Sequence, residues 1–140
     1  MTYEPKFDVD FARGKIGEDL VSGLPEMFLS GKVEVKTDSK AIKTGNFYVE
    51  TWQKSYYSDE WKQSGIYLSE ADYWAFVIEQ NLAMFMITRK ALVELLTENW
   101  ETYREGSQPI CTPETNASKG MLVPISDIVQ KMIEKSGMGA

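Results

Sequence analysis

Residues 33–36, Val-Glu-Val-Lys, constrain this chain more than any other segment because apolar and charged residues alternate along them. Side chains of a β-strand alternate between the two faces of a sheet, so a strand here places Glu34 and Lys36 on one face. Asp38 continues that face, and we expect the valines on the opposite face to pack against a core. The charged residues on the other face must then be solvated, form ion pairs or have a function. A half-exposed strand at the edge of a sheet shows the same alternating pattern without any function.

The segments on either side predict a helix before this strand and a second strand after it. Residues 14–21 have the apolar spacing of an amphipathic helix, with Glu18 near the edge of the apolar stripe. Gly45-Asn46 is a turn signal, and the β-branched and aromatic run that follows it predicts a strand. We expect this strand to return antiparallel to the first, which would bring Glu50 near the charged face.

Several short motifs follow one another in an order that resembles a known family. They are the Glu34–Asp38 run, Lys-Thr-Gly-Asn at 43–46, a strand closing in Glu50, Ser-Gly-Ile at 64–66 and Ala-Asp-Tyr-Trp at 71–74. This order resembles small PD-(D/E)xK proteins of phages and bacteria that are related to Holliday junction resolvases. The resemblance covers roughly residues 10 to 95. It implies an α/β fold with a restriction-endonuclease-like core, in which an N-terminal helix precedes a mixed central sheet with flanking helices.

The resemblance also implies which residues act. Glu18 matches the helix glutamate of the family, and Glu34 and Lys36 match its (D/E)xK pair. The family normally places an aspartate on a strand before that pair, and residues 24–31 contain none. Asp38 or Glu50 could replace it, and both rank ahead of Glu26, because Pro25-Glu26 could equally be the exit of the helix. The expected catalytic residues are Glu18, Glu34, Lys36 and Glu50, and the expected metal ligands are Glu18, Glu34 and Asp38.

The implied chemistry is hydrolysis of phosphodiester bonds with Mg²⁺ or Mn²⁺, and it suits these residue types. Mg²⁺ prefers oxygen ligands and keeps several waters, so one or two carboxylates and a substrate phosphate are enough. Lys36 would orient the attacking water or neutralise developing charge. Histidine is absent from the whole chain, which excludes His general bases, Ser-His-Asp triads and most zinc sites.

The net charge of −6 opposes binding to nucleic acid, because phosphate contacts supply most of the affinity for DNA. The acidic residues of a nuclease site repel DNA less once a metal ion is bound. The segment with the motifs is also rich in lysine, which adds local positive charge. We expect Lys40, Lys43 and Lys54 to contact DNA, although a solvated loop explains the first two equally well. Three nearby aromatic residues could stack on bases, but packing is the commoner role. These residues are Tyr56, Tyr57 and Trp61.

Length and composition predict a single domain over residues 1–140. Its core is expected at about residues 10–95, followed by a loop, an edge strand and a helix over about 100–136. The single cysteine, Cys111, excludes an internal disulfide. No signal-like or membrane-spanning apolar run is present, so we expect a cytoplasmic protein without a membrane partner, in the host cytoplasm if a phage encodes it.

The rest of the chain predicts scaffold elements. Two apolar runs, 73–78 and 82–87, predict buried strands, the first of which could also begin as a short helix. Thr88 is expected to cap a helix through about Thr97 with Ala91, Leu92, Leu95 and Leu96 inside. Further expectations are a helix start at Ser69, a long loop over about 100–120, an edge strand at 122–125, and a last helix from 126–127 to about Lys135.

The combined prediction is a Mg²⁺-dependent DNA endonuclease, resolvase-like and acting on structured or branched DNA. The strongest alternative is a non-catalytic nucleic-acid or protein binding module on the same fold, which the missing aspartate and the acidic charge favour. A third is a nuclease that processes RNA. A homodimer is expected only by analogy with resolvases, whose substrate presents two symmetric strands.

Overall fold

The computed structural model describes residues 32–78 and 83–136. The chain divides into two units, Met1–Val33 and Glu34–Ala140, and the fold below is that of the second unit with the two described residues before it. Glu18, Glu26 and the helix expected at 14–21 lie outside the described residues. The described part is a mixed α/β fold with two sheets and flanking helices, as the sequence predicted at that level.

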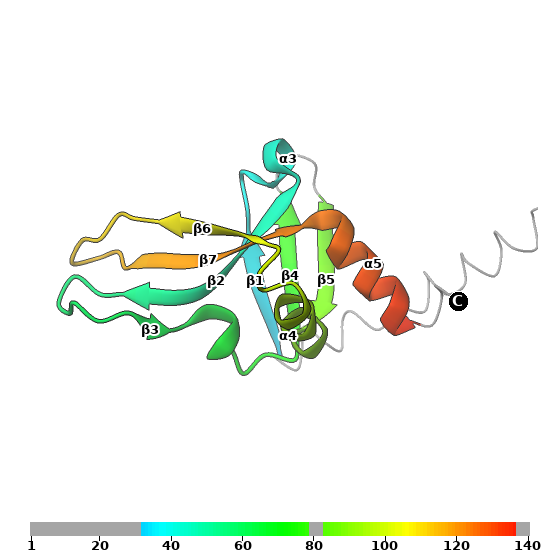
Figure 1. The fold of residues 1–140 in the computed structure, drawn as a ribbon, viewed down its shortest axis with the longest axis horizontal. Helices are drawn as coiled ribbons and strands as arrows, with labels where there is room; N and C mark the ends of the chain where they lie inside the picture. The colour runs from blue at the N-terminus through cyan, green and yellow to red at the C-terminus, as the bar shows by residue number, and fades with distance from the viewer. Residues whose placement is uncertain (1–31, 79–82, 137–140) are drawn as a thin grey trace, which may run out of the picture. The chain divides into compact units, whose positions relative to one another are not determined.

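The described strands form two sheets, drawn in Figure 1. The first has the order β1-β4-β5 and the second the order β3-β2-β7-β6. The strands of the first sheet are β1 (Val33–Thr37), β4 (Tyr73–Ile78) and β5 (Ala83–Thr88). Those of the second are β3 (Lys62–Gln63), β2 (Asn46–Lys54), β7 (Ala117–Pro124) and β6 (Arg104–Gln108).

Two longer helices pack against the strands, and two short helical segments join them. The long helices are α4 (Arg89–Glu98) and α5 (Ile125–Ser136), and the short ones are α3 (Ala41–Thr44) and the 3₁₀ helix η1 (Gly65–Tyr67). The Thr88 side chain accepts a hydrogen bond from the Ala91 amide at 3.1 Å, so the predicted N-cap of α4 is confirmed. The four apolar residues predicted for its inner face are all buried.

One apolar core joins the two sheets. The ring of Phe47 on β2 stacks on the ring of Phe76 on β4, with centroids 4.5 Å apart, and Phe85 on β5 lies 5.7 Å from Phe47. Leu92 from α4 and Ile128 from α5 complete this core, and neither is exposed to solvent. Most of β4 is buried, which explains why its sequence is an uninterrupted apolar run.

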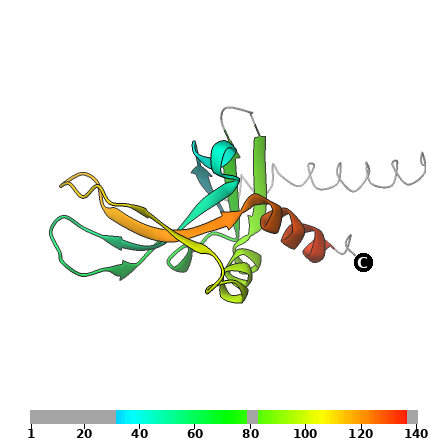
Figure 2. The same cartoon turned by 45° about the horizontal axis from the view of Figure 1, so that its top comes forward.

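The pairing of β2 with β7 forms the spine of the second sheet. It extends from Asn46 opposite Pro124 to Lys54 opposite Ala117, with a β-bulge between Glu50 and Trp52. β3 pairs with the outer side of β2, and β6 pairs with the outer side of β7. Two hairpin arms, β2–β3 and β6–β7, therefore run side by side and bend away from β4 and β5 (Figure 2).

Two glycines lie against the backbone of the bulge. A Cβ atom built on Gly120 would stand 2.2 Å from the Val49 carbonyl oxygen, and one on Gly65 would stand 2.1 Å from the Glu50 carbonyl oxygen. Gly65 also has a positive φ of 54°, which disfavours other residues. Neighbouring backbone thus approaches the bulge closely only because these positions lack side chains.

Three expectations about the strands are wrong. β2 does not return against β1, because α3 and the left-handed Gly45 that ends it redirect the chain, and β2 pairs with β7 in the other sheet. The segment over 100–120 is not a long loop but contains β6 and the start of β7. β7 itself lies between β2 and β6 and is not at an edge, with Pro124 at its end, where a missing amide is tolerated.

Ser69 does not begin a helix. Its hydroxyl accepts hydrogen bonds from the Ala71 amide at 3.2 Å and from the Trp74 indole at 3.1 Å, so it fixes a turn that leads into β4. The last helix, α5, lies where the sequence predicted it, within a residue or so at each end. In the described part of the chain, no helix combines the length and the apolar character needed to cross a bilayer.

Gly120→Ala tests the close packing at the bulge. The new methyl group would overlap the backbone of β2, which cannot move as a flexible side chain can, so we expect unfolding to become easier by about 3 kcal/mol or more. Urea unfolding measures this change. Gly45→Ala is the control, since no atom lies within 4 Å of its Cβ position and only its φ of 72° is unfavourable. Its expected cost is about 1 kcal/mol, and equal costs for the two variants would contradict the packing described.

Candidate functional site

Glu34 and Lys36 form an ion pair on β1. The Lys36 Nζ lies 2.9 Å from the Glu34 Oε1, and both side chains are 42% exposed. Their separation of two residues places them on one face of the strand, as predicted. An ion pair this exposed contributes about 0–1 kcal/mol to stability, so stability alone gives little reason for this pairing.

The ring of Trp74 lies beneath Lys36. The Lys36 Nζ is 5.5 Å from the ring centroid, within the range of a cation–π contact. Trp74 is 1% exposed, and its indole nitrogen is held by Ser69, so the ring is a fixed surface on which the ammonium rests. Val35, which was expected to face the core, is 52% exposed. The charged face of β1 therefore points toward Trp74 of the neighbouring strand, and the prediction for Val35 is wrong.

Asp38 fixes the chain between β1 and β2. Its two carboxylate oxygens accept hydrogen bonds from the amides of Lys40 and Tyr48, each at 2.9 Å, and its own amide donates to the Val77 carbonyl at 3.1 Å. Asp38 thereby joins the turn before α3 to strands of both sheets. These bonds give Asp38 a structural role, and its role as a metal ligand stays a prediction.

Glu50 lies at the bulge of β2. Its Oε2 accepts a hydrogen bond of 2.8 Å from the hydroxyl of Ser64, which is only 2% exposed. The backbone around Glu50 is fixed by Gly65 and Gly120, so the position of this carboxylate is well determined. β-bulges often occur beside functional sites, where they redirect a side chain. The motif Ser-Gly-Ile, noted in the sequence, supplies both the hydroxyl and the glycine at this position.

The predicted metal set is not assembled among the described residues. No three His, Cys, Asp or Glu side chains of residues 32–78 and 83–136 come together closely enough to hold a metal ion. Glu34 lies on β1 and Glu50 on β2, in different sheets, so strand pairing does not join them as expected. Glu18, the remaining predicted ligand and catalytic residue, lies outside the described part of the chain.

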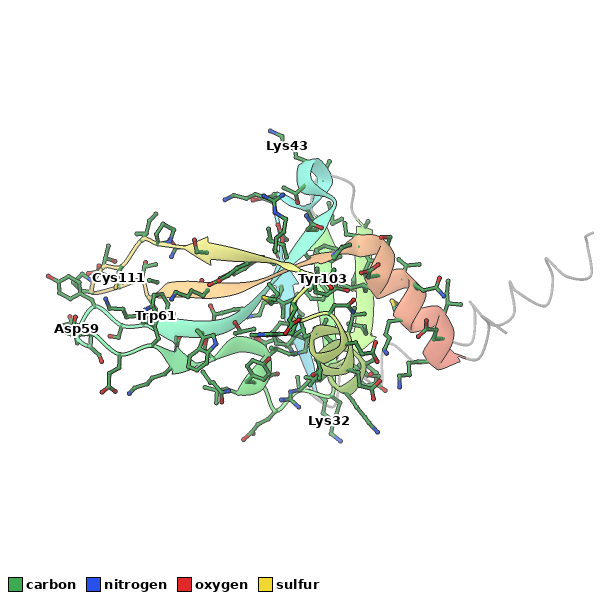
Figure 3. The ribbon with its side chains drawn as sticks, viewed as in Figure 1. Lys32, Lys43, Asp59, Trp61, Tyr103 and Cys111 are labelled. Carbon is green, nitrogen blue, oxygen red and sulfur yellow. The ribbon has the colours of Figure 1, made fainter. Side chains whose placement is uncertain are left out.

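The three predicted DNA-contacting lysines divide into two places. Lys40 and Lys43 are exposed at the two ends of α3, and Figure 3 shows Lys43 projecting from that helix. Lys54 ends β2, where its carbonyl oxygen accepts a hydrogen bond from the Cys111 thiol at 3.6 Å. A strand rises about 3.3 Å per residue, so most of the length of β2 separates Lys54 from α3. The three do not form one patch.

The second sheet carries an aromatic groove that the sequence did not predict. Its volume is about 440 Å³, and we define it by the residues that line it: Thr51, Trp52, Trp61, Trp100, Tyr103, Glu105, Lys119, Gly120 and Met121. Figure 3 labels Trp61 beside the β2–β3 arm and Tyr103 near α4. The aromatic residues come from two separate regions of the sequence, Trp52 with Trp61 and Trp100 with Tyr103, and the pairing of β2 with β7 and of β7 with β6 brings these regions together.

Charged groups accompany the rings of the aromatic groove. The Lys119 Nζ lies 4.1 Å from the centroid of the Trp61 ring, which is a close cation–π contact. The Tyr103 hydroxyl donates a hydrogen bond of 2.6 Å to Asp127 on α5. Burial, followed by the hydrogen bond to the Asp127 carboxylate, raises the pKa of Tyr103 well above its usual range.

Tyr56 and Tyr57, expected with Trp61 to stack on bases, lie outside this groove. They are exposed in the loop between β2 and β3 and contact each other edge to face, with centroids 5.4 Å apart. Of the three aromatic residues named from the sequence, only Trp61 lines the groove.

The chain was compared with family models, with curated proteins and with solved structures, and nothing matches it in any of the three.

Tyr103→Phe tests the electrostatic environment at the edge of the groove. A phenol whose pKa is higher in the folded state stabilises the fold below about pH 10, its ordinary pKa, and loses that contribution as the pH rises further. We expect the free energy of unfolding to fall above about pH 10 in the wild type, and to fall less steeply in Tyr103→Phe. Urea unfolding at a series of alkaline pH values measures both slopes. Tyr57→Phe is the control, and a slope reduced equally in both variants would contradict this assignment.

Proposed function

We propose that this protein is a metal-dependent nuclease that hydrolyses phosphodiester bonds in DNA, built on a restriction-endonuclease-like core. The observation that carries the proposal is the Glu34–Lys36 pair, a carboxylate and an ammonium 2.9 Å apart on one strand, with the ammonium resting on a buried indole. The pair stabilises the fold little, and it matches the (D/E)xK motif of the family that the sequence resembles.

Glu34 is the residue that would hold the metal ion. Its carboxylate oxygens are the hard ligands that Mg²⁺ and Mn²⁺ prefer, and one or two carboxylates are enough when a substrate phosphate completes the shell. Bound metal supplies a polarised phosphate and a coordinated water of lowered pKa. The family resemblance proposes Glu18 as a second ligand.

Lys36 would act on the phosphate. Its ammonium contacts one oxygen of Glu34 and rests on the Trp74 ring, so its position is defined before substrate binds. A preorganised positive charge stabilises the negative charge that builds on the phosphate during attack, and it can orient the attacking water.

Glu50 is the further carboxylate proposed for the reaction. Ser64 holds one of its oxygens, and the bulge fixes its backbone. A carboxylate oriented in this way can position a water or a second cation, as a supporting hydrogen bond orients metal ligands elsewhere. Because β1 and β2 are in different sheets, strand pairing does not join Glu50 to the Glu34–Lys36 pair, and we assign Glu50 its own contact with the substrate.

The proposed substrate is DNA with branched or irregular structure, and the proposed assembly is a homodimer acting in the cytoplasm. Lys40 and Lys43, exposed on α3, would contact phosphates. With a net charge of −6, encounter with DNA would depend on such local positive charge and on metal at the site.

A non-catalytic binding module on the same fold is the second candidate. The observation that favours it is that both carboxylate oxygens of Asp38 accept hydrogen bonds from backbone amides, which gives this residue a structural role. In that case Glu34 and Lys36 would serve as a solvated ion pair on β1, and nucleic acid or protein would bind without being cut.

Glu34→Gln and Lys36→Met test the proposal. Each should lower Mg²⁺-dependent cleavage of branched and linear DNA at least about 100-fold, since each removes a charge aligned with the developing transition state. The free energy of unfolding should change by less than about 1 kcal/mol, as expected for an exposed ion pair. Gel assays of cleavage and urea unfolding of the same samples provide the two measurements.

Lys135→Met is the matched control. Lys135 and Glu94 form an ion pair of 2.7 Å between α5 and α4, with exposures similar to those of the β1 pair. This variant loses a comparable ion pair and should cleave like the wild type. Activity retained in Glu34→Gln or Lys36→Met would remove the central assignment, whereas no cleavage by the wild type with Mg²⁺ or Mn²⁺ would favour the binding module.

A further inference from the structure

The aromatic groove combines features that a nucleotide ligand requires. Trp100 is 44% exposed, and Trp52 and Trp61 are partly exposed, so ring surfaces are open to a ligand. Bases stack on such rings whatever their identity, because every base has a π face. With a volume of about 440 Å³, the groove is in the range of small-ligand sites.

Its two charged residues lie on the same face of the sheet. Glu105 pairs with Met121 and Ser107 pairs with Lys119, so the register makes Glu105 and Lys119 diagonal neighbours on adjacent strands. Lys119 is held over Trp61, which places a positive charge at the rim of a stacking surface. The groove therefore offers rings, one cation and one carboxylate together.

We propose that the aromatic groove binds an unpaired nucleotide in a single-stranded segment of DNA. A base would stack on the exposed Trp100 ring, Lys119 over Trp61 would contact a neighbouring phosphate, and Glu105 would accept hydrogen bonds from base amino or imino groups. This inference rests on the proposed function in taking DNA as the ligand, and it deepens that proposal by adding a single-stranded segment to the substrate.

The charges favour a nucleotide over a peptide. Proline-rich peptides also dock on aromatic-lined grooves, but a polyproline backbone presents no anion for Lys119 and no amide hydrogen for Glu105. A nucleotide presents a phosphate, a π face and hydrogen-bond donors within one small ligand. Duplex DNA does not expose base faces, so the groove suits an unpaired strand.

The register also separates the aromatic groove from the Glu50 carboxylate. Val49 pairs with Met121, which lies on the same face as Lys119, while Glu50 is the next residue along β2 and points to the other face. The groove can therefore be altered without touching Glu50 or the Glu34–Lys36 pair, and binding can be measured apart from cleavage.

The test measures binding of a fluorescein-labelled deoxythymidine oligomer, about 10 nucleotides long, in EDTA. Anisotropy gives the affinity, and intrinsic tryptophan fluorescence reports stacking, because three of the four tryptophans line the groove. We expect the oligomer to quench the fluorescence and to bind more tightly than a duplex of the same length. Trp100→Ala should weaken binding roughly 5- to 100-fold.

Lys119→Ala should weaken binding and reduce the slope of log affinity against log salt by about 0.7, the loss of one phosphate contact on a single strand. Lys62→Ala, which removes an exposed lysine next to Trp61, is the control and should keep the wild-type slope. Urea unfolding of each variant separates loss of binding from loss of fold, and Trp100→Phe should retain most of the affinity of a folded groove.

Several outcomes would overturn the inference. These are oligomer binding without fluorescence quenching, equal affinity in Trp100→Ala, or quenching by a proline-rich peptide but not by DNA. The same measurements on Lys36→Met distinguish the two proposals. If Lys36→Met binds the oligomer and the wild type cuts no DNA, the nuclease proposal fails and the groove stands. If the wild type cuts DNA and the groove variants bind and cut normally, the groove proposal fails alone.

Discussion

The pairing of β2 with β7 is the interaction on which the rest of the described structure depends. It joins residues about 70 positions apart, carries β3 and β6 on its two sides, and contains the bulge that orients Glu50. Its inner face supplies Phe47 to the stack that joins the two sheets. Such long-range pairing is costly to form, since bringing the ends of a long loop together costs conformational entropy before the contacts can form. The close contacts of Gly65 and Gly120 show how tightly the neighbouring backbone packs at the bulge.

Some polar residues of the site stabilise the fold, and others are proposed to take part in the reaction. Asp38 uses both carboxylate oxygens to bind backbone amides, as expected of a carboxylate in a chain reversal. Glu34 and Lys36 bind each other at the surface, where their contribution to stability is small. The proposed chemistry therefore uses a pair that contributes little to the stability of the fold.

Local patterns predicted local structure well, and they predicted distant pairing poorly. The Thr88 cap, the inner face of α4, both strands of the β4–β5 hairpin and the position of α5 follow from residues near one another in the sequence. The partner of β2 does not, because Gly45-Asn46 signals a turn without saying which strand follows it in space. The aromatic groove was missed for the same reason, since Trp52, Trp61 and Trp100 show no common spacing. The alternation of apolar and charged residues correctly placed Glu34 and Lys36 on one face of β1. It also predicted that Val35 is buried, whereas Val35 is exposed.

Binding of Mn²⁺ measured by isothermal titration calorimetry tests the central claim, that Glu34 is a metal ligand beside Lys36. The wild type should bind Mn²⁺, and Glu34→Gln should weaken that binding at least about tenfold, since it removes a charged oxygen ligand. Glu114→Gln, which neutralises an exposed glutamate in the β6–β7 loop, should bind like the wild type. Equal affinities in the wild type and Glu34→Gln, or no binding by the wild type, would contradict the account.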